Sequence, residues 1–323
     1  MVSTSSTNGN TKAIMASLME AQAALYKTQQ QAMSQKNILT PSDNPVGTSV
    51  ILGANQELSN INSFKNNIDY LDTSASMLDS LYSSVWDKVS RINDLALSAA
   101  NGTSASKELM QNYYDEVQSL KEDIVRLANT QFNGEYVFSG TNTGLAPFTL
   151  KDDGSIVYNG TASLNPDGSA IAGAEEYYAK KLEISQNTFV SINNPGDAVF
   201  GFVDNSTDPP SGTGLFFAID EIQKAMDPSN FNQEEISKKL EGLQAGLENI
   251  TSYRTKNGII QSRIASAKEL LENQELQTTE RKSDVQDLDI VEAYSRMTQQ
   301  YYAYQASMQI ASQSMNLSLL NYL

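Results

Sequence analysis

The chain has 323 residues and a formal charge of -16, from 22 Lys and Arg against 38 Asp and Glu, and it contains neither His nor Cys. The two absences exclude zinc sites built from Cys or His, His-ligated haem, disulfides, and nucleophilic triads that need His. The acidic balance argues against nucleic acid as a partner, because binding phosphates requires clustered Lys and Arg. What remains is carboxylate, Lys, Tyr or Ser/Thr chemistry, or no chemistry.

Prolines and glycines divide the chain into three parts. Residues 46–146 and 229–323 contain no proline, whereas residues 133–214 hold eleven of the 18 glycines and five of the 8 prolines. Proline is tolerated poorly inside helices, so long helices are expected in the two proline-free stretches. The glycine-rich middle predicts an inserted domain of turns and short strands.

The first predicted helix precedes Pro41 and carries apolar residues three and four positions apart. That spacing predicts one apolar helix face, formed by Ile14, Leu18, Ala21 and Leu25. Residues 1–40 carry only four charges, so the polar side of this helix consists of Gln, Ser, Asn and Thr.

A long helix follows over residues 46–100. From Phe64 to Ala99 its apolar residues are spaced alternately four and three positions apart, without a break. Such a pattern is typical of a helix packed in a heptad-type seam. A second stripe from Leu109 to Leu127 follows a break at Asn101-Gly102, with Ser104 or Ser106 as its cap. We expect these two helices to fold back on each other.

The middle of the chain contains three short runs with β-type composition, at residues 156–158, 181–185 and 188–192. They predict a small β-rich domain over residues 133–214. Residues 232–289 then resume a helical pattern with Ile260, Ile264 and Leu271 on one face, and supply the partner for the long helix.

The last predicted helix is amphipathic but nearly uncharged, with only Glu292 and Arg296 over residues 290–323. Gln, Ser and Thr solvate an exposed helix less well than Lys and Glu do, so this surface suits burial against other copies of the chain. An intramolecular pair of the two terminal helices is the alternative. The C-terminal residues of this predicted assembly interface are Ile290, Tyr294, Met297, Tyr301, Tyr304, Met308, Ala311 and Met315.

A search for catalytic and binding motifs finds none with a specific pattern. The Gly140–Gly144 and Gly212–Gly214 segments lack the continuation of a phosphate-binding loop and are interpreted as turns. We expect no catalytic residue, no cofactor and no metal. A carboxylate-based hydrolase on a coiled-coil stalk stays open as a remote alternative, with Asp152, Asp153 and Glu183 as its candidates.

Three segments together resemble the flagellin family, and in particular its hook–filament junction members. They are Ile38–Val46 (ILTPSDNPV), Gln131–Gly140 (QFNGEYVFSG) and Leu317–Leu323 (LSLLNYL), and the resemblance covers residues 3–140 and 250–323. Where the family commonly carries Gly in the turn before the first segment, this chain has Gln35.

The resemblance implies a mainly α, elongated multi-helix bundle built from both chain ends, with an inserted β-rich central domain. Three domains are expected: a terminal coiled-coil assembly domain (1–40 plus 290–323), a helical rod domain (41–132 plus 215–289) and a β-rich outer domain (133–214). The implied function is that of a structural adaptor between the flagellar hook and the filament, with no enzymatic activity. A minor filament flagellin is the alternative within the family.

The resemblance also implies the partners and the location. These are flagellin on the filament side, the other hook–filament junction protein on the hook side, further copies of the chain in a ring, and a cytoplasmic export chaperone at the C-terminal helix. The chain is expected to be secreted through the flagellar type III channel and to reside in the bacterial flagellum. No membrane span is expected, because the longest apolar run is Leu215–Ile219.

Overall fold

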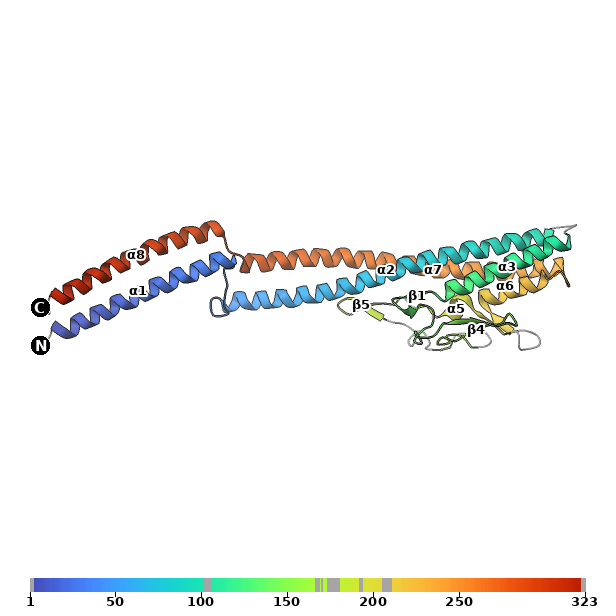
Figure 1. Ribbon diagram of the computed structural model, residues 1–323, viewed down its shortest axis with the longest axis horizontal. Helices are drawn as coiled ribbons and strands as arrows, with labels where there is room; N and C mark the ends of the chain where they lie inside the picture. Colours follow the sequence, from blue (N-terminus) through green and yellow to red (C-terminus); the bar gives the residue numbers. More distant parts are fainter. Residues whose placement is uncertain are drawn as a thin grey trace. The chain divides into compact units, whose positions relative to one another are not determined.

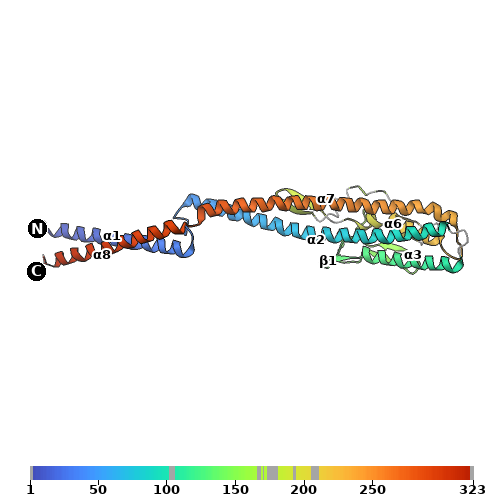
Figure 2. The same cartoon turned by 90° about the horizontal axis from the view of Figure 1, so that it is seen from above.

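The computed structural model describes residues 3–101, 106–165, 169, 171–172, 181–191, 194–204 and 211–320, with helical side chains described from residue 12 to residue 313. The chain forms two compact units, Met1–Asn62 with Glu272–Leu323 and Ser63–Leu271. We call them the terminal unit and the central unit. Figures 1 and 2 show the helices that build them.

The terminal unit contains a pair of helices from the two chain ends. Helices α1 (Ser3–Ser34) and α8 (Ile290–Leu320) lie side by side, as both views show (Figures 1 and 2). The helices predicted at both termini are therefore confirmed. The segments that leave α1 and enter α8 are joined by backbone hydrogen bonds: the Asn37 amide donates to the Gln286 carbonyl (2.8 Å), and the Leu288 amide donates to the Gln35 carbonyl (3.1 Å).

The Pro-Ser-Asp-Asn-Pro segment after α1 is held by Asp43 and Asn44. The Asp43 carboxylate pairs with Lys27 (2.6 Å) and accepts from the Leu39 and Thr40 amides. Lys27 and these amides hold the pKa of Asp43 well below its ordinary value. Asn44 caps the next helix, because its Oδ1 accepts the Gly47 amide (2.9 Å).

Four helices form the bundle of the central unit. They are α2 (Pro45–Asn101), α3 (Lys107–Ala128), α6 (Gly214–Ala225) and α7 (Gln233–Gln286), of which α2 and α7 contribute residues to both units. The predicted helix over 46–100 is confirmed to within one residue at each end. The predicted Ser106 cap is also confirmed, since its side chain accepts the Leu109 amide; Gly102 and Ser104 lie outside the described residues.

Helices α2 and α7 run in opposite directions, as their cross-contacts show. Arg254 pairs with Asp79 (2.9 Å), whereas Lys268, further along α7, pairs with the earlier Asp69 (3.4 Å). Between these pairs, the buried Asn257 donates from its side-chain amide to the Ala75 carbonyl (2.8 Å). A buried amide with one specific partner fixes the register of the two helices.

The described residues of the inserted part of the central unit form short strands and one short helix. Its four-stranded sheet has the order β3-β4-β7-β8, and two separate hairpins are formed by β1-β2 and β5-β6, all antiparallel. The predicted small β-rich domain is thereby confirmed. The elements are β1 (Gln131–Phe132), β2 (Glu135–Tyr136), β3 (Phe148–Leu150), β4 (Ile156–Tyr158), β5 (Lys181–Ser185), β6 (Thr188–Ser191), α5 (Gly196–Phe200), β7 (Phe202–Asp204) and β8 (Ser211–Thr213).

Local sequence explains the first hairpin. Asn133 and Gly134 both have positive φ (51° and 82°), as a two-residue turn between antiparallel strands requires, and Asn-Gly is the pair that best tolerates it. The turn brings Gln131 opposite Tyr136.

An aromatic cluster joins the insert to the helices. Phe138, Phe148, Phe200 and Phe216 are almost fully buried, with neighbouring ring centroids 5.0–5.7 Å apart. These residues come from the turn after β2, from β3, from α5 and from α6, so the insert and the bundle share one core. Large buried rings dominate core energetics, and we expect this cluster to supply much of the stability of the central unit.

Candidate assembly surface

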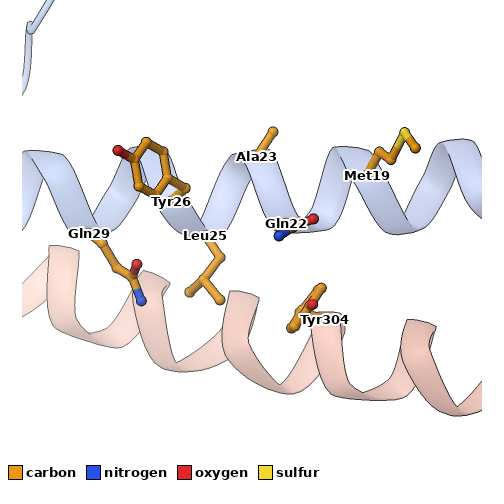
Figure 3. A pocket seen from close by; sticks show the side chains of 7 residues that line it. All are labelled: Met19, Gln22, Ala23, Leu25, Tyr26, Gln29 and Tyr304. Carbon is orange, nitrogen blue, oxygen red and sulfur yellow. The ribbon is translucent and has the colours of Figure 1, made fainter.

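The two terminal helices meet along a seam that mixes apolar side chains with small and polar residues. On α1, Leu25, Thr28 and Gln31 are buried. On α8, the residues that face α1 are spaced alternately four and three positions apart and are buried or half-buried. They are Ala293, Met297, Gln300, Tyr304, Ser307 and Ala311. Figure 3 shows Leu25 directed from α1 toward α8. Only part of the apolar surface of this pair is therefore used between its own helices.

Large apolar side chains cover the outward side of the same pair. Tyr294 is 67% exposed and Met33 is 86% exposed, values that are usual for charged residues and not for tyrosine and methionine. The set of exposed large apolar residues comprises Met15, Met19, Tyr26 and Met33 on α1, and Ile290, Val291, Tyr294, Tyr301, Tyr302, Met308 and Ile310 on α8. We call these eleven residues the outward face. An exposed apolar surface of this extent is typical of an interaction site.

The outward face is nearly free of charge. Over the described side chains of α1 and α8, the charged residues are Lys12, Glu20, Lys27, Glu292 and Arg296. Lys27 is paired with Asp43, and Arg296 is paired with Glu292 (2.6 Å). A shallow cavity of about 460 Å³ lies beside this face (Figure 3), lined by Met19, Gln22, Ala23, Leu25, Tyr26, Gln29 and Tyr304.

The structure divides the twelve residues of the predicted assembly interface between the two sides of the pair. Ile14, Leu18, Ala21 and Leu25 share the buried and half-buried side of α1, and Met297, Tyr304 and Ala311 lie in the α8 seam. In contrast, Ile290, Tyr294, Tyr301 and Met308 are exposed, and Met315 belongs to α8 with its side chain outside the described residues. A role in contacts between subunits stays a prediction for all twelve.

Sequence reasoning missed seven members of the outward face: Met15, Met19, Tyr26 and Met33 on α1, and Val291, Tyr302 and Ile310 on α8. None of them lies on the predicted apolar stripe of its helix, so a search for one stripe per helix passes over them. The signal that identifies them is the excess of apolar residues on a helix with few charges: α8 is apolar on more than one side. A helix of that kind is buried on more than one side.

Two of the three acidic residues considered for hydrolysis accept hydrogen bonds within turns. Asp153 accepts the Ser155 amide (2.9 Å), and this contact lowers its pKa; Glu183 accepts the Asn187 amide (2.8 Å). Asp152 is exposed in the same turn as Asp153, whereas Glu183 belongs to β5 of a separate hairpin. In the described part of the chain, no three acidic side chains gather in a way that could hold a metal ion. Nor does any described helix contain a stretch long and apolar enough to cross a membrane.

Two family models match the chain, and both describe flagellins. The bacterial flagellin N-terminal helical region matches residues 6–143, and the bacterial flagellin C-terminal helical region matches residues 240–323. Together the two matches span well over half of the chain and include most of α1, α2, α7 and α8. The chain belongs to the bacterial flagellin family.

Relatives within that family share a more specific description. The chain is 24% identical to flagellar hook-associated protein 3 of Escherichia coli K12 over 94% of this chain and 95% of the relative, and 23% identical to flagellar hook-associated protein 3 of Salmonella typhimurium LT2 over the same shares. Its fold is also similar to that of the flagellar junction protein FlgL from Legionella pneumophila (15% identity, TM-score 0.57, covering 74% of this chain and 100% of that chain). The chain thus has a structural role in the bacterial flagellum, as its hook-associated relatives do.

Proposed function

We propose that the chain is the adaptor at the hook–filament junction, which assembles at the distal end of the hook and connects the hook-associated zone to the flagellin filament. The observation that carries this proposal is the outward face of the α1–α8 pair. Eleven large apolar residues are exposed there on two helices that carry five described charges. The hook-associated and junction names of the relatives support the same assignment.

Burial of the outward face in an assembly provides the driving force. Covering a Tyr, Met or Ile side chain contributes about 1–3 kcal/mol each, and a half-exposed residue contributes part of that. Ordering two long helices costs about 1–2 kcal/mol per residue for the backbone alone. The seam of the pair contains Ala293, Gln300 and Ser307 beside its few larger apolar residues, so the pair recovers only part of this cost internally. The outward face therefore suits a surface that is completed by neighbouring subunits.

The proposed partners follow from the position of an adaptor. Flagellin covers the outward face from the filament side, the other hook–filament junction protein covers it from the hook side, and further copies of this chain complete a ring. Before secretion, an export chaperone binds α8 and shields the same apolar residues. We assign the chain no enzymatic activity and place it in the flagellum outside the cell.

A complementation experiment with a matched control tests the proposal. In a strain that lacks the gene, the unmodified chain is expected to restore filaments, whereas Tyr294→Ser with Tyr301→Ser leaves bare hooks and free flagellin in the medium. The control is Gln299→Ser with Gln305→Ser, which changes two exposed polar residues of the same helix. Electron microscopy scores the hooks, and an immunoblot of the medium confirms that each variant is exported.

Two results would contradict the proposal. Normal filaments in the deletion strain show that the chain is not the adaptor. Normal filaments with the double tyrosine variant show that the outward face of α8 is not the assembly surface.

A further inference from the structure

Sulfur atoms are distributed unevenly between the interior and the surface of the chain. It contains 10 Met and no Cys, so thioethers are its only sulfur groups. Among the described side chains, Met110 and Met226 are buried in the central unit, and Met77 packs half-buried against the same core. Met297 is half-buried in the seam between α1 and α8. The core and the seam thus shield these four thioethers wholly or in part.

Four further methionines are exposed, and all of them belong to the outward face. Met33 is 86% exposed, Met19 64%, Met308 49% and Met15 37%. Met19 also lines the shallow cavity beside the pair (Figure 3). In the isolated chain, small solutes in water therefore reach these four thioethers without any opening of the fold.

The three exposed methionines of α1 lie on one line along the helix. Met19 and Met33 are fourteen residues apart, which is close to four turns, and Met15 precedes Met19 by about one turn. Midway between Met19 and Met33 lies the exposed ring of Tyr26. A chemical change at these sulfurs therefore alters one continuous strip of α1.

Thioethers are the groups of this surface that a peroxide oxidises readily. A sulfur lone pair attacks one peroxide oxygen, the O–O bond breaks, and that oxygen stays on sulfur. The other oxygen takes up the proton of the first and leaves as water, so the sulfur loses two electrons and the peroxide gains them. The product, methionine sulfoxide, is polar, and methionine sulfoxide reductases return it to methionine.

A sulfoxide on the outward face makes burial of that face less favourable. In the free chain, water solvates the sulfoxide oxygen. A neighbouring subunit removes this water, and an acceptor that finds no donor in the contact is then left unsatisfied. The seam between α1 and α8 does not include the four exposed methionines, so their oxidation changes the outer surface of the pair and leaves its seam in place.

We propose that Met15, Met19, Met33 and Met308 form an oxidation site, at which a peroxide converts the thioethers to sulfoxides and thereby prevents the unassembled chain from joining its neighbours. The effect on assembly rests on the proposed function, which makes the outward face a contact surface. The order of oxidation rests on exposure alone. The modification is reversible, because sulfoxide reductases restore the apolar surface.

Mass spectrometry of the isolated full-length chain tests the site without reference to assembly. The chain is treated with hydrogen peroxide, and the oxidation of each methionine is followed in peptides over time. The four exposed methionines are expected to react at least about tenfold faster than Met110 and Met226, whose surroundings must first open to solvent. Among the four, Met33 is expected to react first. Equal rates for Met33 and Met226 would overturn the site.

Bare hooks from a strain that lacks the gene test the effect on assembly. The hooks receive the purified chain together with flagellin, and electron microscopy counts the filaments. The unoxidised chain is expected to restore filaments. The chain oxidised at the four exposed methionines is expected to restore about tenfold fewer, which corresponds to about 1.4 kcal/mol of lost binding. Treatment of the oxidised chain with sulfoxide reductases should recover the filaments.

Leucine variants separate the four exposed methionines from the others. Leucine keeps the apolar surface but has no sulfur to oxidise, so peroxide should leave the filament yield of the fourfold variant unchanged. The control variant, Met77→Leu with Met110→Leu, should lose filaments on oxidation as the unmodified chain does. An equal loss in both variants would overturn the assignment to the outward face. The fourfold variant combines Met15→Leu, Met19→Leu, Met33→Leu and Met308→Leu.

A measurement on the unmodified chain depends on no variant. Partially oxidised chain is added to bare hooks, and the sulfoxide content of the hook-bound chain is compared with that of the chain left in solution. Sulfoxides at Met19 and Met33 are expected to be depleted at least about threefold in the bound chain. Equal sulfoxide content in the two fractions would overturn the inference.

The outcomes separate this inference from the proposed function. Unoxidised chain that binds no hooks and restores no filaments counts against the adaptor role. Equal filament numbers with unoxidised and oxidised chain leave the adaptor role intact and overturn the effect of oxidation on assembly.

Discussion

The central and terminal units differ in what their interiors contain. The twelve largest fully buried side chains among the described residues all belong to the central unit, and they include Tyr82, Phe138 and Phe216. In the terminal helical pair, the most buried α8 residues are Ala293 and Ala311, whereas Tyr294, Tyr301 and Tyr302 are exposed. The central unit buries its bulky residues within the single chain, whereas the terminal helical pair leaves many of its bulky residues exposed.

The two units also differ in the burial of their ion pairs. In the central unit, Lys121 Nζ contacts Asp220 Oδ1 (2.5 Å) and the Gly154 carbonyl (3.2 Å), with both side chains almost fully buried. The ion pairs of the terminal unit, such as Arg296 with Glu292, are exposed. A buried pair with specific partners fixes the position of three elements, α3, α6 and the β3–β4 turn. Exposed ion pairs contribute little to the free energy of folding and do little to fix the positions of the elements that they join.

The largest effect is expected from breaking the buried pair of the central unit. Asp220→Ala leaves the Lys121 ammonium buried without a carboxylate, which should lower the free energy of unfolding by about 3–5 kcal/mol. The double variant Lys121→Met with Asp220→Leu should lose less, because no charge then remains buried. Urea unfolding measures both. A double variant that is less stable than Asp220→Ala would contradict the role assigned to the pair.

The same substitution in both units tests the comparison itself. Leu78, in the central unit, is 1% exposed, and Leu25, in the terminal pair, is 9% exposed. Leu78→Ala should lower the free energy of unfolding by about 3–5 kcal/mol, since it opens a cavity in a closed core. Leu25→Ala should cost about 1–2 kcal/mol, because the seam around it is only partly closed. Equal losses in denaturant unfolding would remove the distinction between the units.

Alkaline pH should destabilise the central unit through Tyr82. Burial raises the pKa of Tyr82 far above its ordinary value of 10.0. Above pH 10 the unfolded chain releases this proton while the folded chain retains it, so stability is present below pH 10 and falls as the pH rises, by about 1.4 kcal/mol per pH unit. Tyr82→Phe should remove this decrease in the free energy of unfolding between pH 10 and 12.

The control for this experiment is made at neutral pH. There, Tyr82→Phe should cost about 1 kcal/mol, because the Asn194 side-chain amide loses the hydroxyl to which it donates (3.0 Å). An unchanged alkaline slope in urea unfolding would show that the Tyr82 hydroxyl does not remain protonated in the folded chain.

A small stabilisation is expected at the turn that ends α1. Gln35 has φ of 57°, a left-handed conformation that Gly adopts at little cost. Gln35→Gly should therefore raise the stability of the terminal unit by about 0.5–1 kcal/mol, whereas Gln35→Ala, which retains a Cβ, should not. Thermal unfolding of residues 1–62 and 272–323, followed through local probes, distinguishes the two. A lower stability of the Gly variant would contradict the assignment of strain to this residue.

Sequence periodicity was sufficient for the long helices and the position of the insert. The apolar stripe on α2 permits few interpretations other than a helix, because the helical spacing continues without a break. Its members Ile68, Leu71, Ala75 and Leu78 are all buried. The Asn133-Gly134 pair likewise has one strongly preferred conformation. Strand pairing in the insert was not predictable, since β4 and β7 are separated by more than forty residues and pair through Ile156 and Val203.

The candidate surface was less predictable than the fold. The apolar stripe on α8 predicts a helix. It does not predict which side of the helix faces α1, because apolar residues occupy several sides. The structure places Ala293, Gln300 and Ser307 in the seam. Small residues allow two helices to approach closely, and this preference is invisible to a search for large apolar side chains. The buried pair of Lys121 with Asp220 was also missed, because 99 residues separate its members.

Hydrogen exchange on the isolated full-length chain tests the central claim most directly. The account predicts that amides of α1 and α8 exchange at least about a hundredfold faster than those of α2 between residues 68 and 96, since helices without a closed core open locally at low cost. Mass spectrometry of peptides from both units, at neutral pH and low concentration, measures the ratio. Equal protection of α1, α8 and α2 in the isolated chain would contradict the claim that the terminal pair is completed by other molecules.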